Sequence, residues 1–234
     1  MTEREGMRVR AGLAVPAAGT GQRMGGVKKP FLELAGIPVL ERALRPFLED
    51  DRLVAVAVAL GPDDADAPPA WLTGLDTRVR VVAGGATRTE SVRRAIAALP
   101  DDLDVIAVHD AARPFVTSQV VRRCFDLAAD GVGAVAGTPA TDTIKRVDRN
   151  GDVVDTPARE TLWHAQTPQA FPAEALRRAY REPAMEGTDD AALLEGTGLT
   201  IRMVDAGPGN EKITHADDLA LGEAMLAALV PSAP

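Results

Sequence analysis

Aromatic residues are scarce in this 234-residue sequence, which contains two Trp, one Tyr and five Phe and is only 3% aromatic. Its core must therefore be built mainly from Ala, Val, Leu and Ile, within a hydrophobic fraction of 46%. That fraction is typical of globular proteins and excludes a disordered or collagen-like chain. The length suits one large domain, residues 1–234, and disfavours two domains of equal size.

Cysteine and long hydrophobic runs are also lacking. Cys124 is the only cysteine, so the chain can form neither an internal disulfide nor a cysteine-based zinc site, and the expected location is cytoplasmic. No stretch approaches the roughly 18 apolar residues that a membrane helix needs, and the charged residues 1–12 precede no apolar segment. We therefore expect a protein that does not contact the membrane.

Positive charge is in the minority, with 26 Lys and Arg against 34 Asp and Glu and a net charge of −8. An acidic surface repels polyanions as a whole, which argues against nucleic acid or an anionic membrane as a partner. Any anion that binds must therefore be held by a local group of cations.

Hydrophobic patterning predicts strands that alternate with helices. Apolar runs bounded by turn residues indicate buried strands, and apolar residues at helical spacing separate them. This order is typical of an α/β fold with a mostly parallel sheet and helices on both faces. The predicted strands are Val9–Val15, Leu53–Leu60, Val79–Val82, Val105–Val108, Val132–Ala136 and Thr200–Val204. The predicted helices are Val39–Leu48, Glu90–Leu99, Ser118–Ala129, Ala173–Glu182 and His215–Leu229.

One segment departs from this alternation. Between Thr143 and Thr156, two short β-like pieces flank Asn150-Gly151, a dipeptide that strongly favours a hairpin turn. We expect a protruding β-arm at about residues 141–164. Such an arm can cover a site, reach a neighbouring subunit or remain a solvated hairpin.

The densest site signal is the glycine-rich segment 16–26, directly after the first predicted strand. Glycine lets backbone N–H groups approach an anion closely, and the small Ala17 and Ala18 leave room for a flat ligand. The segment is not a Walker A loop, and Met24 stands where a dinucleotide fingerprint has its third glycine. Arg23, Lys28 and Lys29 follow closely, which favours a triphosphate-binding loop over a plain strand connection.

His109 and Asp110 follow the predicted strand Val105–Val108, at the sheet edge where open α/β folds bind ligands. The Asp110 carboxylate suits Mg²⁺ bound against phosphate oxygens. Side-chain alternation turns His109 away from Asp110, so we interpret His109 as a hydrogen-bonded packing residue rather than a base.

Three further polar segments are weaker signals. Arg88 and Ser91 follow the glycine pair at 84–85 at a predicted helix start, where they could contact phosphate or base or could form an ordinary cap. Residues 187–190 have the composition of a helix N-cap. The loop 209–214 contributes a single lysine, Lys212.

Together these segments resemble the 2-C-methyl-D-erythritol 4-phosphate cytidylyltransferase family, which uses CTP in the non-mevalonate isoprenoid pathway. The resemblance spans about residues 9–229, and its motifs occur in the family's order. They are PAAGTGQRMG (16–25), VHDAARP (108–114), TDTIKR (141–146), LWHAQTPQAF (162–171), TDDA (188–191) and NEKIT (210–214).

The resemblance implies a Rossmann-like nucleotidyltransferase fold, Mg²⁺-dependent transfer of CMP from CTP to methylerythritol phosphate, and a homodimer joined through the arm. It assigns catalytic roles to Arg23, Lys29 and Lys212. Motif positions imply nucleotide contacts from Ala17, Ala18, Gly19, Gly85, Arg88, Ser91 and Asp110, with Asp110 also binding the metal. They imply sugar-phosphate contacts from Thr143, Arg159, Arg113 and Thr188, with Thr143 and Arg159 acting across the dimer.

Two positions depart from the family pattern. The order Lys28-Lys29-Pro30-Phe31 leaves Lys28 as an alternative to Lys29, and Ala86 stands where an acidic residue is frequent. Ribitol-5-phosphate cytidylyltransferases look similar over the same motifs and are an alternative for the acceptor. A regulatory module that binds nucleotide without catalysis is a further alternative.

Overall fold

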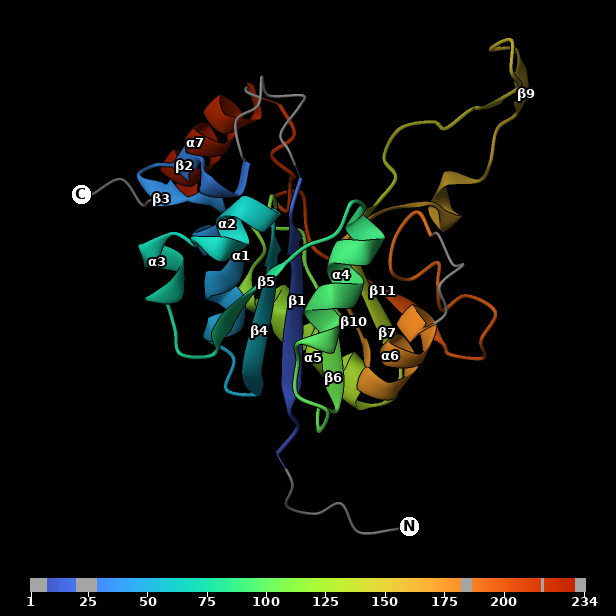
Figure 1. The fold of residues 1–234 in the computed structure, drawn as a ribbon. Coiled ribbons are helices and arrows are strands. Elements are labelled where there is room, and N and C mark those ends of the chain that lie inside the picture. The colour runs from blue at the N-terminus through green and yellow to red at the C-terminus, as the bar shows by residue number, and fades with distance from the viewer. Residues whose placement is uncertain (1–7, 20–28, 182–186, 216, 230–234) are drawn as a thin grey trace.

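The computed structural model describes residues 8–19, 29–181, 187–215 and 217–229. Its centre is a seven-stranded sheet in the order β11-β7-β10-β6-β1-β4-β5 (Figure 1). All neighbouring strands are parallel except at β10, which is antiparallel to both β6 and β7. The strands are β1 Ala11–Ala17, β4 Leu53–Leu60, β5 Val79–Ala83, β6 Val105–Val108, β7 Gly133–Pro139, β10 Trp163–Pro172 and β11 Ile201–Asp205.

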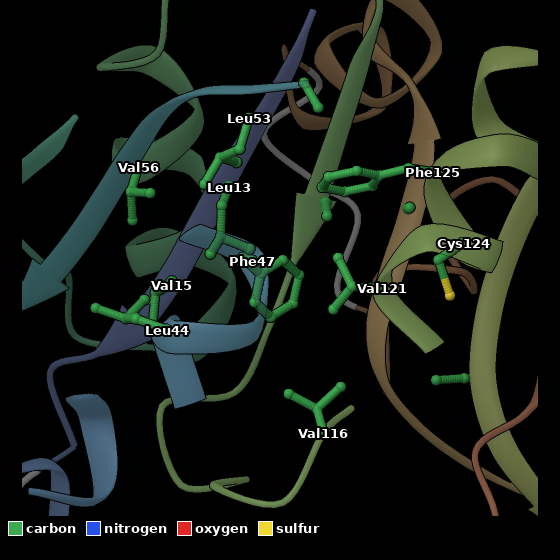
Figure 2. Packing of buried hydrophobic residues seen from close by; sticks show 14 of the residues in the cluster. Leu13, Val15, Leu44, Phe47, Leu53, Val56, Val116, Val121, Cys124 and Phe125 are labelled. Atoms are coloured by element: carbon green, nitrogen blue, oxygen red, sulfur yellow. The ribbon is translucent and has the colours of Figure 1, made fainter. Parts of the chain in front are cut away.

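Helices cover both faces of the sheet, as the alternating pattern predicts. α1 (Val39–Leu48) and α5 (Ser118–Ala129) pack on one face, and α4 (Arg88–Ala97) and α6 (Ala173–Arg181) pack on the other. In β1, Leu13 faces the first pair and Ala14 the second. Figure 2 shows Phe47 of α1 beside Leu13, and the rings of Phe47 and Phe125 of α5 are 6.2 Å apart. Phe171 and Tyr180 belong to the layer on the opposite face, so the few aromatic side chains contribute to both layers of a mainly aliphatic core.

Local sequence explains where the helices begin. The Thr87 hydroxyl accepts from the backbone N–H of Glu90, and the Glu90 carboxylate accepts from the N–H of Ala86, the residue before the cap, so two N–H groups at the start of α4 are satisfied in a variant of the capping box. Thr117 caps α5 in the same way through the N–H of Val120. α4 therefore begins at Arg88, two residues before the expected start at Glu90, and Arg88 lies in its first turn.

The long strand β10 is absent from the elements that the sequence predicts. Gln166, Thr167 and Gln169 interrupt its apolar pattern, although all three side chains are buried. The Thr167-Pro168 peptide bond is cis, and the strand register with β7 shifts between Ala165 and Gln169. These polar side chains are buried because they bond to groups in neighbouring loops. Their presence breaks the apolar pattern, so periodicity does not reveal β10 as a strand.

The predicted arm is present as an excursion between β7 and β10. Its hairpin pairs β8 (Arg146–Val147) with β9 (Val153–Asp155), and Gly151 occupies the turn with φ +90°. Figure 1 shows this segment reaching away from the body of the molecule. The side chains of Val147, Val153 and Val154 are between 51% and 63% exposed. The arm therefore presents an apolar surface that the rest of its own chain does not cover.

Smaller elements surround the sheet. A satellite cluster of Leu34, Val39 and Ile213 connects the hairpin of β2 (Glu33–Leu34) and β3 (Ile37–Pro38) to α7 (Asp217–Leu229). Within the described residues, no helix is both long and apolar enough to cross a membrane. The remaining short helices are η2 Lys29–Phe31, α2 Pro62–Asp66, α3 Ala70–Thr73 and η3 Arg159–Thr161.

Candidate active site

The carboxyl end of β1 borders a cavity of about 150 Å³. Ala17, Ala18 and Gly19 form one wall, as the small residues of this segment predict. The backbone at Gly84 approaches closely from β5: a Cβ there would lie 2.5 Å from the Cβ of Ala18 and 3.1 Å from a backbone oxygen. Glycine at 84 therefore allows the two loops to meet. The other lining residues are Phe31, Gly61, Pro62, Asp63 and Asp64.

The predicted cations of this loop are only partly placed. Arg23 and the alternative Lys28 lie outside the described residues, and Lys29 is described by its backbone, as the first residue of η2. Their contacts to a ligand remain predictions.

Asp110 lies just beyond β6 and is the centre of a cluster of cations. Its Oδ2 atom is 2.7 Å from Lys212 Nζ and 3.7 Å from Arg113 Nε, and its Oδ1 atom is 3.2 Å from Arg88 Nε. The Thr167 hydroxyl accepts from the Asp110 backbone N–H at 3.0 Å. Burial opposes ionisation of Asp110, but the charges of Arg88 and Lys212 outweigh it and hold its pKa well below the usual range. The carboxylate is therefore ionised at neutral pH.

The structure thus brings together Arg88, Asp110, Arg113 and Lys212, four residues that the sequence analysis selects from three separate segments. Ser91, in the first turn of the same helix as Arg88, has a structural role instead. Its hydroxyl accepts from the Gly85 N–H at 3.0 Å and donates to the Thr87 carbonyl at 2.9 Å. Ser91 therefore fixes the glycine loop at 84–85 relative to α4.

Hydrogen bonds to backbone carbonyls hold the loop that carries Lys212 close to Asp110. Arg113 donates to the carbonyl of Asn210 at 2.8 Å, and the Ile213 N–H donates to the carbonyl of Ala112 at the same distance. The buried Asn210 amide donates to the carbonyl of Thr167 at 2.9 Å. The loop 209–214 is thereby tied to the turn after β6 and to β10.

His109 is a packing residue, as side-chain alternation predicts. Its ring is completely buried, lies 5.0 Å from the Phe47 ring, and hydrogen-bonds through its two nitrogens to Thr167 Oγ1 and to the Arg113 carbonyl. Burial lowers its pKa to about 4, so the ring is neutral near pH 7. His109 supports the turn that carries Asp110 and Arg113.

The residues expected to contact a sugar phosphate lie apart from this cluster, except for Arg113. Thr143 and Arg159 are exposed at the base of the arm, where Arg159 donates to the Thr141 carbonyl at 3.0 Å. Thr188 is exposed on the segment that follows α6. Across the described ranges, no hydrogen bond or ion pair joins these three side chains to Asp110.

Sequence reasoning missed several polar residues beneath the site, chiefly Asp190 and Tyr180. Asp190 pairs with Arg88, and Tyr180 donates its hydroxyl to Asp190. The sequence signal for them was the pair of aspartates at 189–190, whose composition suggests a helix N-cap. Only Asp189 acts in that way, by accepting from the Ala192 N–H at 2.9 Å.

Within the cluster described above, the Asp110 carboxylate is a candidate ligand for a divalent cation. In the part of the chain that the structure describes, no three His, Cys, Asp or Glu side chains gather into a complete metal site. A single ionised carboxylate nonetheless fits a cation that takes its remaining ligands from substrate phosphates and water. The donor set therefore suits a metal that arrives with a nucleotide.

The family model for 2-C-methyl-D-erythritol 4-phosphate cytidylyltransferase matches residues 12–228. This chain belongs to that family. A cytidylyltransferase of this name from Symbiobacterium thermophilum is 42% identical over 225 residues, covering 94% of both chains. Another from Chromohalobacter salexigens is 43% identical and covers 92% of this chain and 89% of the relative.

Solved structures of the family have the same fold. The synthase from Anaerococcus prevotii superposes with a TM-score of 0.84 at 26% identity, covering 94% of this chain and 96% of that one. The cytidylyltransferase from Thermus thermophilus gives 0.76 at 33% identity, covering 94% and 100%. The predicted nucleotidyltransferase fold is confirmed.

Family membership makes the protein an enzyme, a cytidylyltransferase of the non-mevalonate isoprenoid pathway, and confirms the resemblance carried by the motifs. Nucleotidyltransferases generally use a divalent metal, and the members of this family act on small-molecule substrates.

Proposed function

We propose that this cytidylyltransferase works by in-line attack of the methylerythritol phosphate on the α-phosphorus of Mg²⁺-bound CTP. A bond forms from a phosphate oxygen of the acceptor to the α-phosphorus, and the bond to the departing pyrophosphate breaks. The products are 4-diphosphocytidyl-2-C-methyl-D-erythritol and pyrophosphate. The observation that carries the proposal is the Asp110 carboxylate surrounded by Lys212, Arg88 and Arg113, just beyond strand β6, which pairs in parallel with β1.

The nucleotide is held at the carboxyl ends of β1 and β5. Backbone N–H groups of Ala17, Ala18 and Gly19 face its phosphates, since small residues allow close approach. Gly85, Arg88 and Ser91 bind near the cytosine and ribose; Ser91 contributes by holding the Gly85 N–H.

Charge neutralisation is the main catalytic task. The attacking phosphate oxygen is already anionic at neutral pH, so no strong general base is needed, and the difficulty is to bring two anions together. Arg23, Lys29 and Lys212 stabilise the charge that develops around phosphorus and on pyrophosphate. When bound at Asp110, Mg²⁺ supplies further positive charge at the phosphates.

The acceptor is bound by residues from two subunits. Arg113 and Thr188 of one protomer contact the methylerythritol phosphate, together with Thr143 and Arg159 from the partner's arm. The exposed Val147, Val153 and Val154 support a homodimer through the arm, because exposed apolar side chains on a protruding hairpin favour association. The working unit is thus a dimer of single 1–234 domains, located in the cytoplasm, without nucleic acid or membrane partners.

An assay of pyrophosphate release tests the assignment of the acceptor. With CTP and Mg²⁺, methylerythritol phosphate should support turnover, whereas ribitol 5-phosphate and the other nucleoside triphosphates should support much less. Comparable rates with ribitol 5-phosphate would contradict the acceptor assignment. CTP binding without turnover under any condition would indicate a binding protein that lacks catalysis.

A further inference from the structure

A buried carboxylate, Asp190, lies behind the cluster of cations around Asp110. The Asp190 side chain is completely buried, and it receives two bonds from Arg88: Nη1 to Oδ1 at 3.2 Å and Nη2 to Oδ2 at 2.8 Å. The Tyr180 hydroxyl donates to the same Oδ1 atom. Tyr180 belongs to α6 and is only 5% exposed, so this contact is within the protein core.

These contacts fix the orientation of Arg88. A guanidinium is planar, and its five N–H groups point in fixed directions. Because Asp190 engages both terminal nitrogens, only Nε is directed at Asp110, at 3.2 Å. Arg88 therefore bridges the completely buried carboxylate of Asp190 and the carboxylate of Asp110 just beyond β6.

The backbone around Asp190 is itself anchored to the sheet. Gln169 of β10 donates to Asp189 Oδ2 at 2.9 Å and accepts from the Ala191 N–H at 2.8 Å. Residues on both sides of Asp190 are thus held by one buried amide, which directs the Asp190 side chain inward. The arrangement is a chain of contacts from β10 and α6 to Arg88.

The charges favour the same geometry. Without Asp190, both terminal nitrogens of Arg88 would be free to turn toward Asp110, where they would compete with Lys212 and with an incoming ligand. Burial, and then the adjacent Asp190 charge, raise the pKa of Tyr180, so its hydroxyl remains a donor throughout the neutral range.

We propose that Asp190 and Tyr180 are positioning residues for Arg88: they hold its guanidinium so that Asp110 stays available to Lys212 and the metal-bound nucleotide. This inference rests on the proposed function, in which Arg88 contacts CTP. Neither residue touches a substrate, and both act through Arg88.

A double-mutant cycle on the full-length enzyme tests this mechanism. Tyr180→Phe removes one hydroxyl and keeps the ring, and it is measured alone and combined with Arg88→Met. Since a hydrogen bond to a charged group is being removed, KM for CTP should rise about 10-fold in the native background, with a smaller change in kcat. In the Arg88→Met background, Tyr180→Phe should leave KM unchanged. Asp190→Asn should raise KM at least as much as Tyr180→Phe.

Thr197→Val is the matched control. It removes a hydroxyl that donates to the Leu194 carbonyl at 2.7 Å, without contact to Arg88, and should leave KM for CTP unchanged. Melting temperature is recorded for every variant. If Arg88→Met does not fold, Arg88→Lys replaces it in the cycle, because lysine keeps a charge beside Asp190 but cannot bridge both carboxylates.

The outcomes separate the two proposals. A native KM for CTP in Tyr180→Phe, or an equal rise in both backgrounds, would overturn the positioning role while leaving the proposed function intact. A native KM and kcat in Arg88→Met would instead refute the nucleotide contact of Arg88 in the proposed function.

Discussion

Lys212 Nζ lies 2.7 Å from Asp110 Oδ2, although 102 residues separate the two in the sequence. Arg88 and Arg113 approach the same carboxylate. An internal anion thus holds these cations in place before substrate arrives. Triphosphate and metal would exchange partners with a preassembled cluster, which reduces the reorganisation needed at the time of reaction.

Replacing Lys212 should impair chemistry more than folding. In Lys212→Met, kcat/KM for CTP should fall by about 10²-fold or more, because the variant lacks a charge that is proposed to stabilise the reacting phosphates. The control is Arg123→Met, which removes an exposed charge from α5 and should leave kcat/KM unchanged. Steady-state kinetics and melting curves measure both. Near-native turnover in Lys212→Met would show that Lys212 has no part in the mechanism. Arg23→Ala should lower kcat/KM for CTP to a similar extent.

Asp110→Asn should separate nucleotide binding from catalysis. Neutralising the carboxylate leaves Arg88, Arg113 and Lys212 without their shared anion, so calorimetry in EDTA should show metal-free CTP binding at least as tightly as to the native enzyme. Turnover with Mg²⁺ should fall by about 10²-fold or more, because the proposed metal ligand is lost. Weaker CTP binding in EDTA would show that Asp110 organises the cations more than it competes with the ligand.

The exposed valines of the arm predict an effect on assembly. The native enzyme should have twice the 24.6 kDa chain mass by light scattering. Val153→Ser with Val154→Ser removes apolar area from β9 and should shift the enzyme toward the monomer. As the dimer dissociates, KM for methylerythritol phosphate should rise, because Thr143 and Arg159 are proposed to act across the interface. A fully active monomer would contradict the shared site.

His109 should make stability depend on pH without affecting catalysis directly. Its pKa is about 4 when folded and near 6.5 when unfolded, so the unfolded chain binds a proton in that interval and the folded chain does not. Stability is therefore complete above about pH 6.5 and decreases toward pH 4, by about 1–2 kcal/mol between pH 7 and 5. Urea unfolding at both pH values should show that loss, and His109→Gln should show a smaller one. An equal loss of stability in His109→Gln would show that other groups cause the pH dependence.

The sequence predicts the sheet and its helices well, because their signals are local. The run Leu53–Leu60 and the helix Val39–Leu48 have their predicted bounds, since turn residues and hydrophobic spacing determine both. Asp110 and Lys212 are selected separately, by a strand end and by a motif, and the structure brings the two side chains into contact.

The residues that sequence reasoning missed act through distant partners. Gln169 resembles a surface residue by composition, yet it is 1% exposed because Asp189 and Ala191 satisfy its amide. Tyr180 fits the apolar face of α6, and nothing local indicates that its hydroxyl bonds to Asp190 ten residues later. Such pairings depend on tertiary structure and carry no periodicity.

The reversed direction of β10 has a consequence for how the arm can vary. Because β7 and β10 are antiparallel neighbours, the chain leaves β7 at Pro139 and enters β10 at Trp163 directly opposite it, at the edge where β6 presents Asp110. The intervening segment needs no crossover helix and carries no strand of the main sheet. Its length and tip can therefore change, by insertion, truncation or exchange with a relative's arm, while the register of the catalytic sheet is preserved.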